Sequence, residues 1–232
     1  MARKLKALGV ACFALLAMGA IGASAASAHT FDVEVDHTIL SAEVTPTFKE
    51  GKQIFTTATG EVVCKKISLS SASPENTILV AEGKTTGIEA VTAQPTYSEC
   101  TATIPELGTV KETYEFTTCY YEFTGKTDAN EHAEVHVKCT TKGDEIHVKV
   151  TAANLKCYTI PEQTLGGIHY TDTPNSGGAT RDIDVLATIE SLETTKEGAC
   201  GSGVEKNGTY SGEVTVKGTD TEGKQKGILT TP

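Results

Sequence analysis

The chain has 232 residues and a formal net charge of −10, with no tryptophan and only 6% aromatic residues. Such an acidic chain repels nucleic acid and anionic lipid headgroups, which argues against both as partners. The length allows one large all-β domain or two small ones.

The first 28 residues have the three parts of an export signal. Basic residues stand near the start, an apolar run covers residues 7–21, and a small-x-small pattern ends at Ala28, with Ala25 as an alternative cleavage site. The apolar run is shorter than the ~20 residues of a spanning helix. We therefore expect a secreted chain of 204 residues (232 minus 28) with no membrane span. Loss of the three basic residues changes its net charge from −10 to −13.

Beyond the signal, apolar and polar residues alternate with a period of two, which is typical of half-buried antiparallel strands. The pattern is clearest between Cys119 and Ile160, where Tyr121 and Phe123 share the inward face with Cys119. No helical period exceeds one or two turns. Strands are expected near residues 31–36, 53–59, 62–69, 77–81, 88–92, 96–104, 113–117, 119–124, 132–139, 145–150, 154–160, 182–189, 212–217 and 227–230.

Turn and loop signals separate these strands. Residues 70–76 and 171–180 are expected loops, and Asn207-Gly208 is a two-residue hairpin signal. The sequence therefore predicts an all-β fold over residues 29–232, an antiparallel β-sandwich or a sandwich-like barrel.

Cys12 lies in the signal, and the other cysteines imply three disulfides because an even number in an exported chain is normally paired. Zinc is disfavoured, since no two cysteines have C-x2-C or C-x4-C spacing. Spacing alone leaves many pairings open. We predict Cys64–Cys100, Cys119–Cys139 and Cys157–Cys200. Only the middle pair has a structural argument, because its cysteines end strands joined by a single loop.

A short internal similarity links residues 100–108 with residues 157–166. In each, a cysteine-bearing strand ends at Ile-Pro-Glu and a Leu-Gly turn follows. Proline ends a strand because it cannot donate a hydrogen bond to the ladder. Two interpretations stay open: a duplicated β-unit, with two similar sheets packed face to face, or a coincidence of strand-end chemistry.

Several short motifs occur in series: V-V-C-K-K, P-T-Y-S-E-C, F-T-T-C-Y-Y-E-F, V-H-V-K-C, L-K-C-Y-T-I-P-E-Q, R-D-I-D-V-L-A-T-I and N-G-T-Y-S-G-E-V-T-V-K-G. With the signal peptide, they resemble a family of secreted, cysteine-containing hypothetical proteins of high-GC Gram-positive soil bacteria. The resemblance covers nearly the whole mature chain. It implies an exported, disulfide-bonded β protein and assigns no activity and no functional residue.

One histidine cluster suggests a metal site. On a strand, His132, Glu134 and His136 share one face, and a turn after Cys139 that folds the next strand back would bring His147 close to His136. Two imidazoles and a carboxylate are ligands for zinc or copper. The competing interpretation, a solvent-facing polar strand, is favoured because alternate strand residues lie ~6.5 Å apart.

The sequence offers two further candidate cation sites. Cleavage after Ala28 makes His29 the N-terminus, whose amine and imidazole chelate copper, and residues 126–131 offer oxygens to Ca²⁺. No hydrolase motif is present. We therefore expect a non-catalytic extracellular binding or structural protein of unknown ligand, without a cofactor. The alternative is a secreted copper- or zinc-dependent enzyme using His29 or His132, His136 and His147.

Overall fold

The computed structural model describes the strands and turns of an all-β protein, with one short 3-10 helix at Gly198–Cys200. No helix among the described residues is both long and apolar enough to cross a membrane. The predicted signal peptide, His29 and the predicted calcium loop lie outside the described residues. These are residues 30–34, 47–48, 52–58, 60–71, 80–81, 84–85, 90–104, 108–125, 132–150, 155–174, 181–219 and 225–231.

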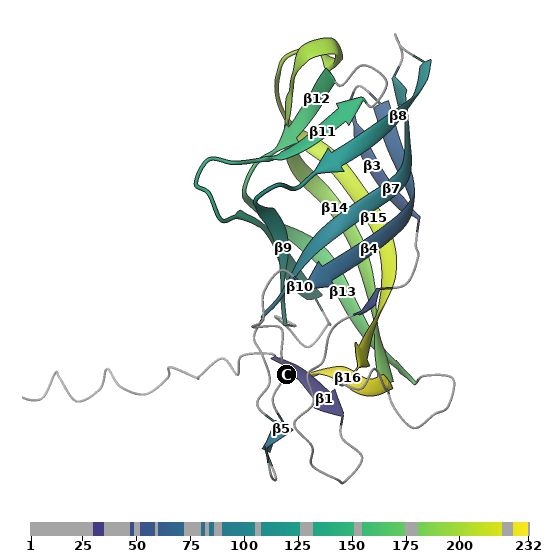
Figure 1. The fold of residues 1–232 in the computed structure, drawn as a ribbon, viewed down its shortest axis with the longest axis vertical. Coiled ribbons are helices and arrows are strands. Elements are labelled where there is room, and N and C mark those ends of the chain that lie inside the picture. The colour runs from purple at the N-terminus through teal and green to yellow at the C-terminus, as the bar shows by residue number, and fades with distance from the viewer. Residues whose placement is uncertain are drawn as a thin grey trace, which may run out of the picture.

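The described strands are mostly those that the alternating pattern predicts (Figure 1). They are β1 Thr30–Glu34, β2 Thr47–Phe48, β3 Gln53–Thr57, β4 Gly60–Ser71, β5 Val80–Ala81, β6 Lys84–Thr85, β7 Ala90–Ile104, β8 Gly108–Glu115, β9 Cys119–Thr124, β10 His132–Cys139, β11 Ile146–Val150, β12 Leu155–Ile160, β13 Gln163–Pro174, β14 Arg181–Lys196, β15 Gly203–Thr219 and β16 Gln225–Thr231.

The strands close into an eight-stranded antiparallel barrel. Its ring runs β14, β15, β3, β4, β7, β9, β10, β13 and back to β14, and every neighbouring pair is antiparallel. The all-β class and the antiparallel pairing are thus confirmed, and the barrel is the form that the strands take. Closure matters because it encloses the inward side chains in one interior.

Three further strands extend one side of this barrel. Strands β8 and β9 both pair with β7, so they run in the same direction along it. In the same way β12 and β13 both pair with β14, and β11 pairs with β8 and β12. The wall between β7 and β14 therefore has two parts. In Figure 1, β8, β11 and β12 lie towards one end, and β9, β10 and β13 lie towards the other.

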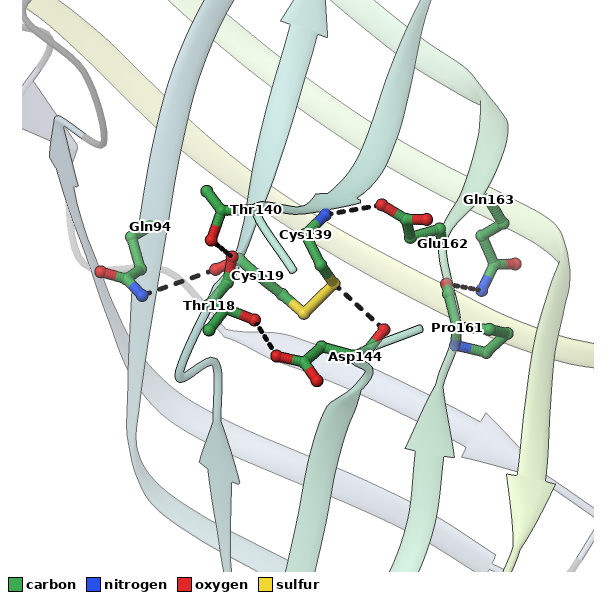
Figure 2. Close-up of a disulfide and its surroundings, with 9 residues drawn as sticks. All are labelled: Gln94, Thr118, Cys119, Cys139, Thr140, Asp144, Pro161, Glu162 and Gln163. Atoms are coloured by element: carbon green, nitrogen blue, oxygen red, sulfur yellow. Dashed lines mark hydrogen bonds between the residues drawn. A yellow bond between two sulfur atoms is a disulfide. The ribbon is translucent and has the colours of Figure 1, made fainter. Parts of the chain in front are cut away.

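The two parts of the wall meet where the chain passes from one to the other, at residues 116–118, 140–145 and 161–162, which we call the seam. Figure 2 shows its centre, the Cys119–Cys139 disulfide between directly opposed residues of β9 and β10. Thr118 Oγ1 donates to Asp144 Oδ2 at 2.6 Å, and the amide of Thr140 donates to the Thr118 carbonyl at 2.9 Å. Local hydrogen bonds thus fasten two of the three crossings.

Side chains also replace ladder hydrogen bonds at the seam. The amide of Cys139 donates to Glu162 Oε1 at 2.9 Å (Figure 2). The Gln163 side chain acts as a peptide group would: its Oε1 accepts from the Glu193 amide at 2.9 Å, and its Nε2 donates to the Glu193 carbonyl at 3.0 Å. Backbone groups that leave the regular pairing therefore stay hydrogen-bonded, as buried peptide groups require.

The three predicted disulfides are confirmed. They join Cys64 to Cys100, Cys119 to Cys139 and Cys157 to Cys200. The first two connect directly opposed residues of neighbouring strands. Their cysteines are mostly buried among the inward-facing side chains, so the bridges add to a core that is poor in large aromatic residues.

The inward face follows from the alternation. On β10, Ala133, Val135 and Val137 are buried, whereas His132 and Glu134, which alternate with them, are exposed. Strand β14 does the same over its length, with Ile183, Val185, Ala187 and Ile189 buried. Burial of this continuous apolar lining is the main stabilising term, at about 25 cal/mol per Å² of apolar surface.

Three sequence-based expectations about connections are wrong. The loop expected at residues 171–180 does not begin at residue 171, because residues 171–174 belong to β13 and pair with β14. The segment after Cys139 does not fold β10 back onto the next strand, because β10 pairs with β9 and β13 while β11 pairs with β8 and β12. Asn207-Gly208 is not a hairpin turn but lies inside β15, where Gly208 faces Leu192. A Cβ at Gly208 would meet the Leu192 carbonyl oxygen at 2.9 Å, so this glycine serves close strand packing.

Candidate functional site

A cavity lies inside the barrel. Its volume is about 70 Å³. Its lining comes from both parts of the wall and from the long strands, and it is mostly aliphatic and aromatic. The volume is about half the ~150 Å³ of an engineered apolar cavity that binds benzene. A closed barrel with an interior of this kind is a typical place for one small ligand.

Four tyrosines line this cavity: Tyr97, Tyr114, Tyr121 and Tyr210. The Tyr97 hydroxyl lies 3.3 Å from that of Tyr121, and it donates to Tyr210 Oη at 3.5 Å. The Tyr97 and Tyr114 rings pack with centroids 4.8 Å apart. The cluster therefore combines aromatic surface with hydrogen-bonding groups that are held in place by one another.

Burial governs the acidity of these phenols, because it disfavours the charged phenolate. It raises the pKa of Tyr121 to about 12, while the hydrogen bond between Tyr121 and Tyr97 opposes the rise. Burial, followed by the neighbouring tyrosines, also raises the pKa of Tyr97 and that of Tyr210 above 10.0. The cavity tyrosines are thus neutral hydrogen-bonding groups throughout the ordinary pH range.

Gln53 anchors one end of the tyrosine cluster. Its side chain is buried, its Oε1 accepts a hydrogen bond from the Tyr210 hydroxyl, and its Nε2 donates to the Glu213 carbonyl at 3.4 Å. Gly212 makes room for this arrangement, because a Cβ there would overlap the Gln53 side-chain oxygen. The Gln53 amide is therefore held at the cavity wall, next to a position of β15 where glycine leaves room for it.

Glu112 is the one buried acid on the inward face of β8. It alternates with Val110 and Tyr114 and is only 4% exposed. Neither carboxylate oxygen has a hydrogen-bond partner within the described part of the chain. Desolvation raises the pKa of Glu112 from 4.5 to about 7, because burial without a partner disfavours the carboxylate.

Tyr158 of β12 lies close to Glu112 at the same end of the interior. Its hydroxyl accepts a hydrogen bond from Thr57 Oγ1 at 3.1 Å, and its ring packs edge-on against Phe55 with centroids 6.2 Å apart. Burial raises the pKa of Tyr158, and the charges of Glu112 and Glu205 act in the same direction. This end of the barrel therefore combines aromatic rings with two carboxyl groups.

The predicted metal ligands do not converge. His132 packs edge-on against His169 of β13, with ring centroids 4.6 Å apart. His147 lies on β11, in the other part of the wall, opposite Glu115 and Thr159. Among the described residues, no three His, Cys, Asp or Glu side chains are placed to hold one metal ion.

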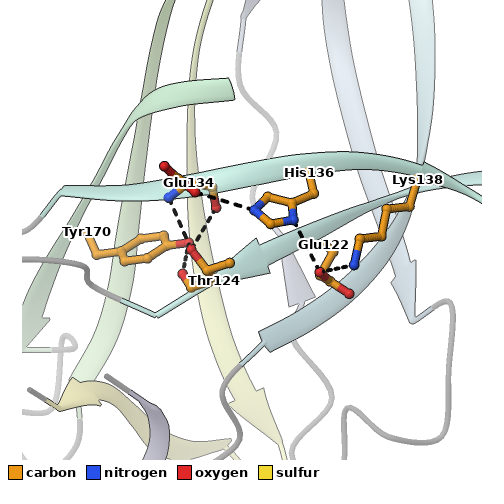
Figure 3. A network of polar contacts seen from close by, with 6 residues as sticks. All are labelled: Glu122, Thr124, Glu134, His136, Lys138 and Tyr170. Carbon is orange, nitrogen blue, oxygen red and sulfur yellow. Dashed lines mark hydrogen bonds and ion pairs between the residues drawn. The ribbon is translucent and has the colours of Figure 1, made fainter. Parts of the chain in front are cut away.

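His136 and Glu134 belong instead to an ion-pair network on the outside of the barrel (Figure 3). His136 Nδ1 lies 3.5 Å from Glu122 Oε1, and His136 Nε2 lies 3.5 Å from Glu134 Oε2. Lys138 Nζ contacts the same Glu122 oxygen at 2.6 Å. A lysine that shares a carboxylate with the imidazole opposes a second cation, so the arrangement links β9 to β10 and disfavours a metal.

The residues beside this network are also structural. Thr124 Oγ1 donates to the Glu134 carbonyl and accepts from the Glu134 amide, both at 3.1 Å. From the interior side, the Tyr170 hydroxyl donates to the Thr124 carbonyl at 2.9 Å (Figure 3). These bonds hold the end of β9 against β10 and β13.

Sequence reasoning placed Tyr121 and Phe123 on the inward face, and both line the cavity. It did not identify Tyr97, Tyr210 or Glu112. The usable signal was in V-K-E-T-Y, where alternation puts the acid on the same face as the valine and the tyrosine. A charged residue on an apolar face indicates a site.

The cavity can hold a small, largely apolar molecule and offer hydrogen bonds to one polar group of it. Comparisons with protein-family models, curated proteins and solved structures found no match to this chain. The functional argument therefore depends on the site itself.

Proposed function

We propose that this protein is an exported, non-catalytic binding protein that takes up a small, mostly apolar molecule inside its barrel. The observation that carries the proposal is the apolar interior cavity into which Tyr97, Tyr114, Tyr121 and Tyr210 project. Tyrosine rings give contact area, and their hydroxyls orient a polar group of the ligand.

The size of the cavity limits the ligand. The volume of about 70 Å³ is about half the ~150 Å³ of an engineered cavity that binds benzene. The ligand is therefore no larger than a single small ring or a short chain, and a ring fits only when the lining side chains move apart slightly. A sterol or a long fatty acid exceeds this space.

An extracellular location fits the other features. Disulfides persist outside the reducing cytosol, and all three bridges of this protein are formed between mostly buried cysteines. The N-terminal sequence has the pattern of an export signal, and the secreted family that the chain resembles agrees with export. A released protein with a closed interior suits the capture of a small molecule from the surroundings.

The test uses 4-ethylphenol, which combines a ring with one hydroxyl, and isothermal calorimetry on the full exported chain. Ala187 lines the cavity on β14, while the neighbouring Thr188 is exposed. We expect wild type and Thr188→Leu to bind 4-ethylphenol equally, and Ala187→Leu, which fills the cavity, to bind it at least tenfold more weakly. Absence of binding to wild type, or equal binding to all three proteins, contradicts the proposal.

A further inference from the structure

Glu112 stands next to the cavity on the strand that carries one of its tyrosines. Tyr114 lines the cavity, and Glu112 precedes it by two residues on the same face of β8. Successive residues on one face of a strand are ~6.5 Å apart. Glu112 does not itself line the cavity, so a ligand in the cavity needs an arm that passes Tyr114 to reach its carboxyl group.

No cation among the described residues faces this carboxylate. On its own strand the neighbouring inward group is Tyr114, and from β12 it is Tyr158. On β7 the directly opposed residue is Cys100, which is in a disulfide, and on β11 it is Val150.

The charged groups nearest in the interior are already engaged with each other. Glu205 of β15 accepts from the Ala58 amide at 2.5 Å, and Lys196 Nζ lies 3.3 Å from its other oxygen. The outward Lys149 is paired with Glu115 at 2.5 Å. Neither lysine is therefore available to neutralise Glu112.

An ionised carboxylate that is buried without a partner is costly, and it is stabilised when a cation pairs with it in the same low-dielectric space. Tyrosine rings add to this by attracting a cation over their faces. The next inference rests on the function proposed above. We propose that the ligand is a small amine: its protonated nitrogen pairs with Glu112, and its apolar, ring-sized body fills the tyrosine-lined cavity.

The residues that line the cavity also determine how the rest of such an amine is held. A ring placed among Tyr97, Tyr114 and Tyr121 contacts aromatic surface, and a two-carbon arm spans the step from the cavity to Glu112. At the opposite end the Gln53 and Tyr210 pair offers hydrogen bonds to a ring substituent. Phenethylamine is the simplest probe of this shape, and 4-ethylphenol is a probe of similar size that carries a ring hydroxyl and no amine.

The experiment measures the affinity of both probes for three forms of the full exported chain by calorimetry at pH 8. The forms are wild type, Glu112→Gln, and the control Glu115→Gln on the outward face of β8. We expect wild type and Glu115→Gln to bind phenethylamine at least tenfold more tightly than 4-ethylphenol. Glu112→Gln is expected to lose at least tenfold in affinity for phenethylamine and to keep its affinity for 4-ethylphenol.

A pH series on wild type tests the same inference without a variant. Glu112 must give up its proton to pair with the amine, and the pKa of free Glu112 is about 7. The affinity for phenethylamine should therefore rise about tenfold per pH unit up to pH 7 and then level off while the amine stays protonated. The affinity for 4-ethylphenol should not change over this range.

The outcomes separate this inference from the proposed function. Tight binding of 4-ethylphenol with no preference for phenethylamine, or unchanged phenethylamine binding by Glu112→Gln, overturns the amine assignment and leaves the cavity as a binding site. If wild type binds neither probe, both the proposed function and the amine assignment are wrong. If Glu112→Gln does not fold, a flat pH profile of wild type below pH 7 decides against the amine.

Discussion

The phenol oxygens of Tyr97 and Tyr121 lie 3.3 Å apart inside the barrel, although 24 residues separate them in the chain. The pair exists because β7 and β9 are neighbours in the ring, and their inward faces meet in one interior. Hydroxyl groups in such surroundings keep their protons, which makes the cluster visible to a simple titration.

The first prediction concerns alkaline pH. Burial raises the pKa of Tyr121 to about 12 and those of Tyr97, Tyr114 and Tyr210 well above 10.0. A raised folded-state pKa means that the stability present below pH 10 is lost as the pH rises beyond it, since the unfolded chain releases protons first. Ultraviolet titration should show these phenols ionising later in the folded protein than in urea. Identical curves contradict the prediction.

The second prediction concerns Glu112 and stability. Its pKa is raised from 4.5 to about 7, so the folded state loses about 2–3 kcal/mol from this group as the pH rises through that window. Glu112→Gln has no such proton to lose. Guanidinium unfolding should show the variant gaining about 2–3 kcal/mol relative to wild type between pH 5 and pH 8. A constant difference across this range means that the carboxyl group is not desolvated.

The third prediction compares two adjacent glycines of β13. Gly167 has a φ of +84°, and a Cβ there would overlap the carbonyl oxygen of Thr188, whereas Gly166 has open space around it. Gly167→Ala should destabilise the protein by about 2–4 kcal/mol, because it combines backbone strain with a steric clash. Gly166→Ala should change stability by less than about 1 kcal/mol. Equal effects in thermal unfolding contradict this account.

The fourth prediction concerns the seam. Replacing Cys119 and Cys139 with serine removes a bridge that closes a loop of 20 residues and should cost about 3 kcal/mol. Hydrogen exchange of the Thr140 and Cys139 amides should become faster, because their acceptors lie at the crossing that the disulfide holds.

The matched control is the double serine variant at Cys64 and Cys100. This bridge joins β4 to β7 away from the seam, so it should lower stability by a similar amount without selective exchange at Thr140. Equal acceleration at Thr140 in both double variants indicates general loosening and excludes a local role for the Cys119–Cys139 bridge.

The fold class was within reach of the sequence, and so was the Cys119–Cys139 bridge, whose cysteines end strands joined by a single loop. The other two predicted pairings are also formed, but no argument from spacing supported them. The period-two pattern shows which residues share a face, and it placed Cys119, Tyr121 and Phe123 inward correctly. The pattern does not predict which strands pair, because a period of two is the same whichever neighbour a strand has. The segment after Cys139 therefore looked like a hairpin, while in the structure it carries the chain to the other part of the wall.

The cavity was out of reach for a related reason. Gln53, Tyr97 and Tyr210 come from three strands that only barrel closure brings together. No local spacing connects them, since the Gln53 and Tyr210 contact spans 157 residues. The His132, Glu134 and His136 cluster was locally conspicuous, yet β10 places it on the outer surface among other charges.

The seam gives this barrel a modular side. Because β7 and β14 each serve as continuous neighbours to both parts of the wall, the six shorter strands between them form two panels that share a frame. Extra residues at a crossing lengthen a loop and leave the pairing within each panel unchanged. We therefore expect one panel to tolerate changes in length and sequence that alter the shape of the cavity, while β7 and β14 keep the barrel closed.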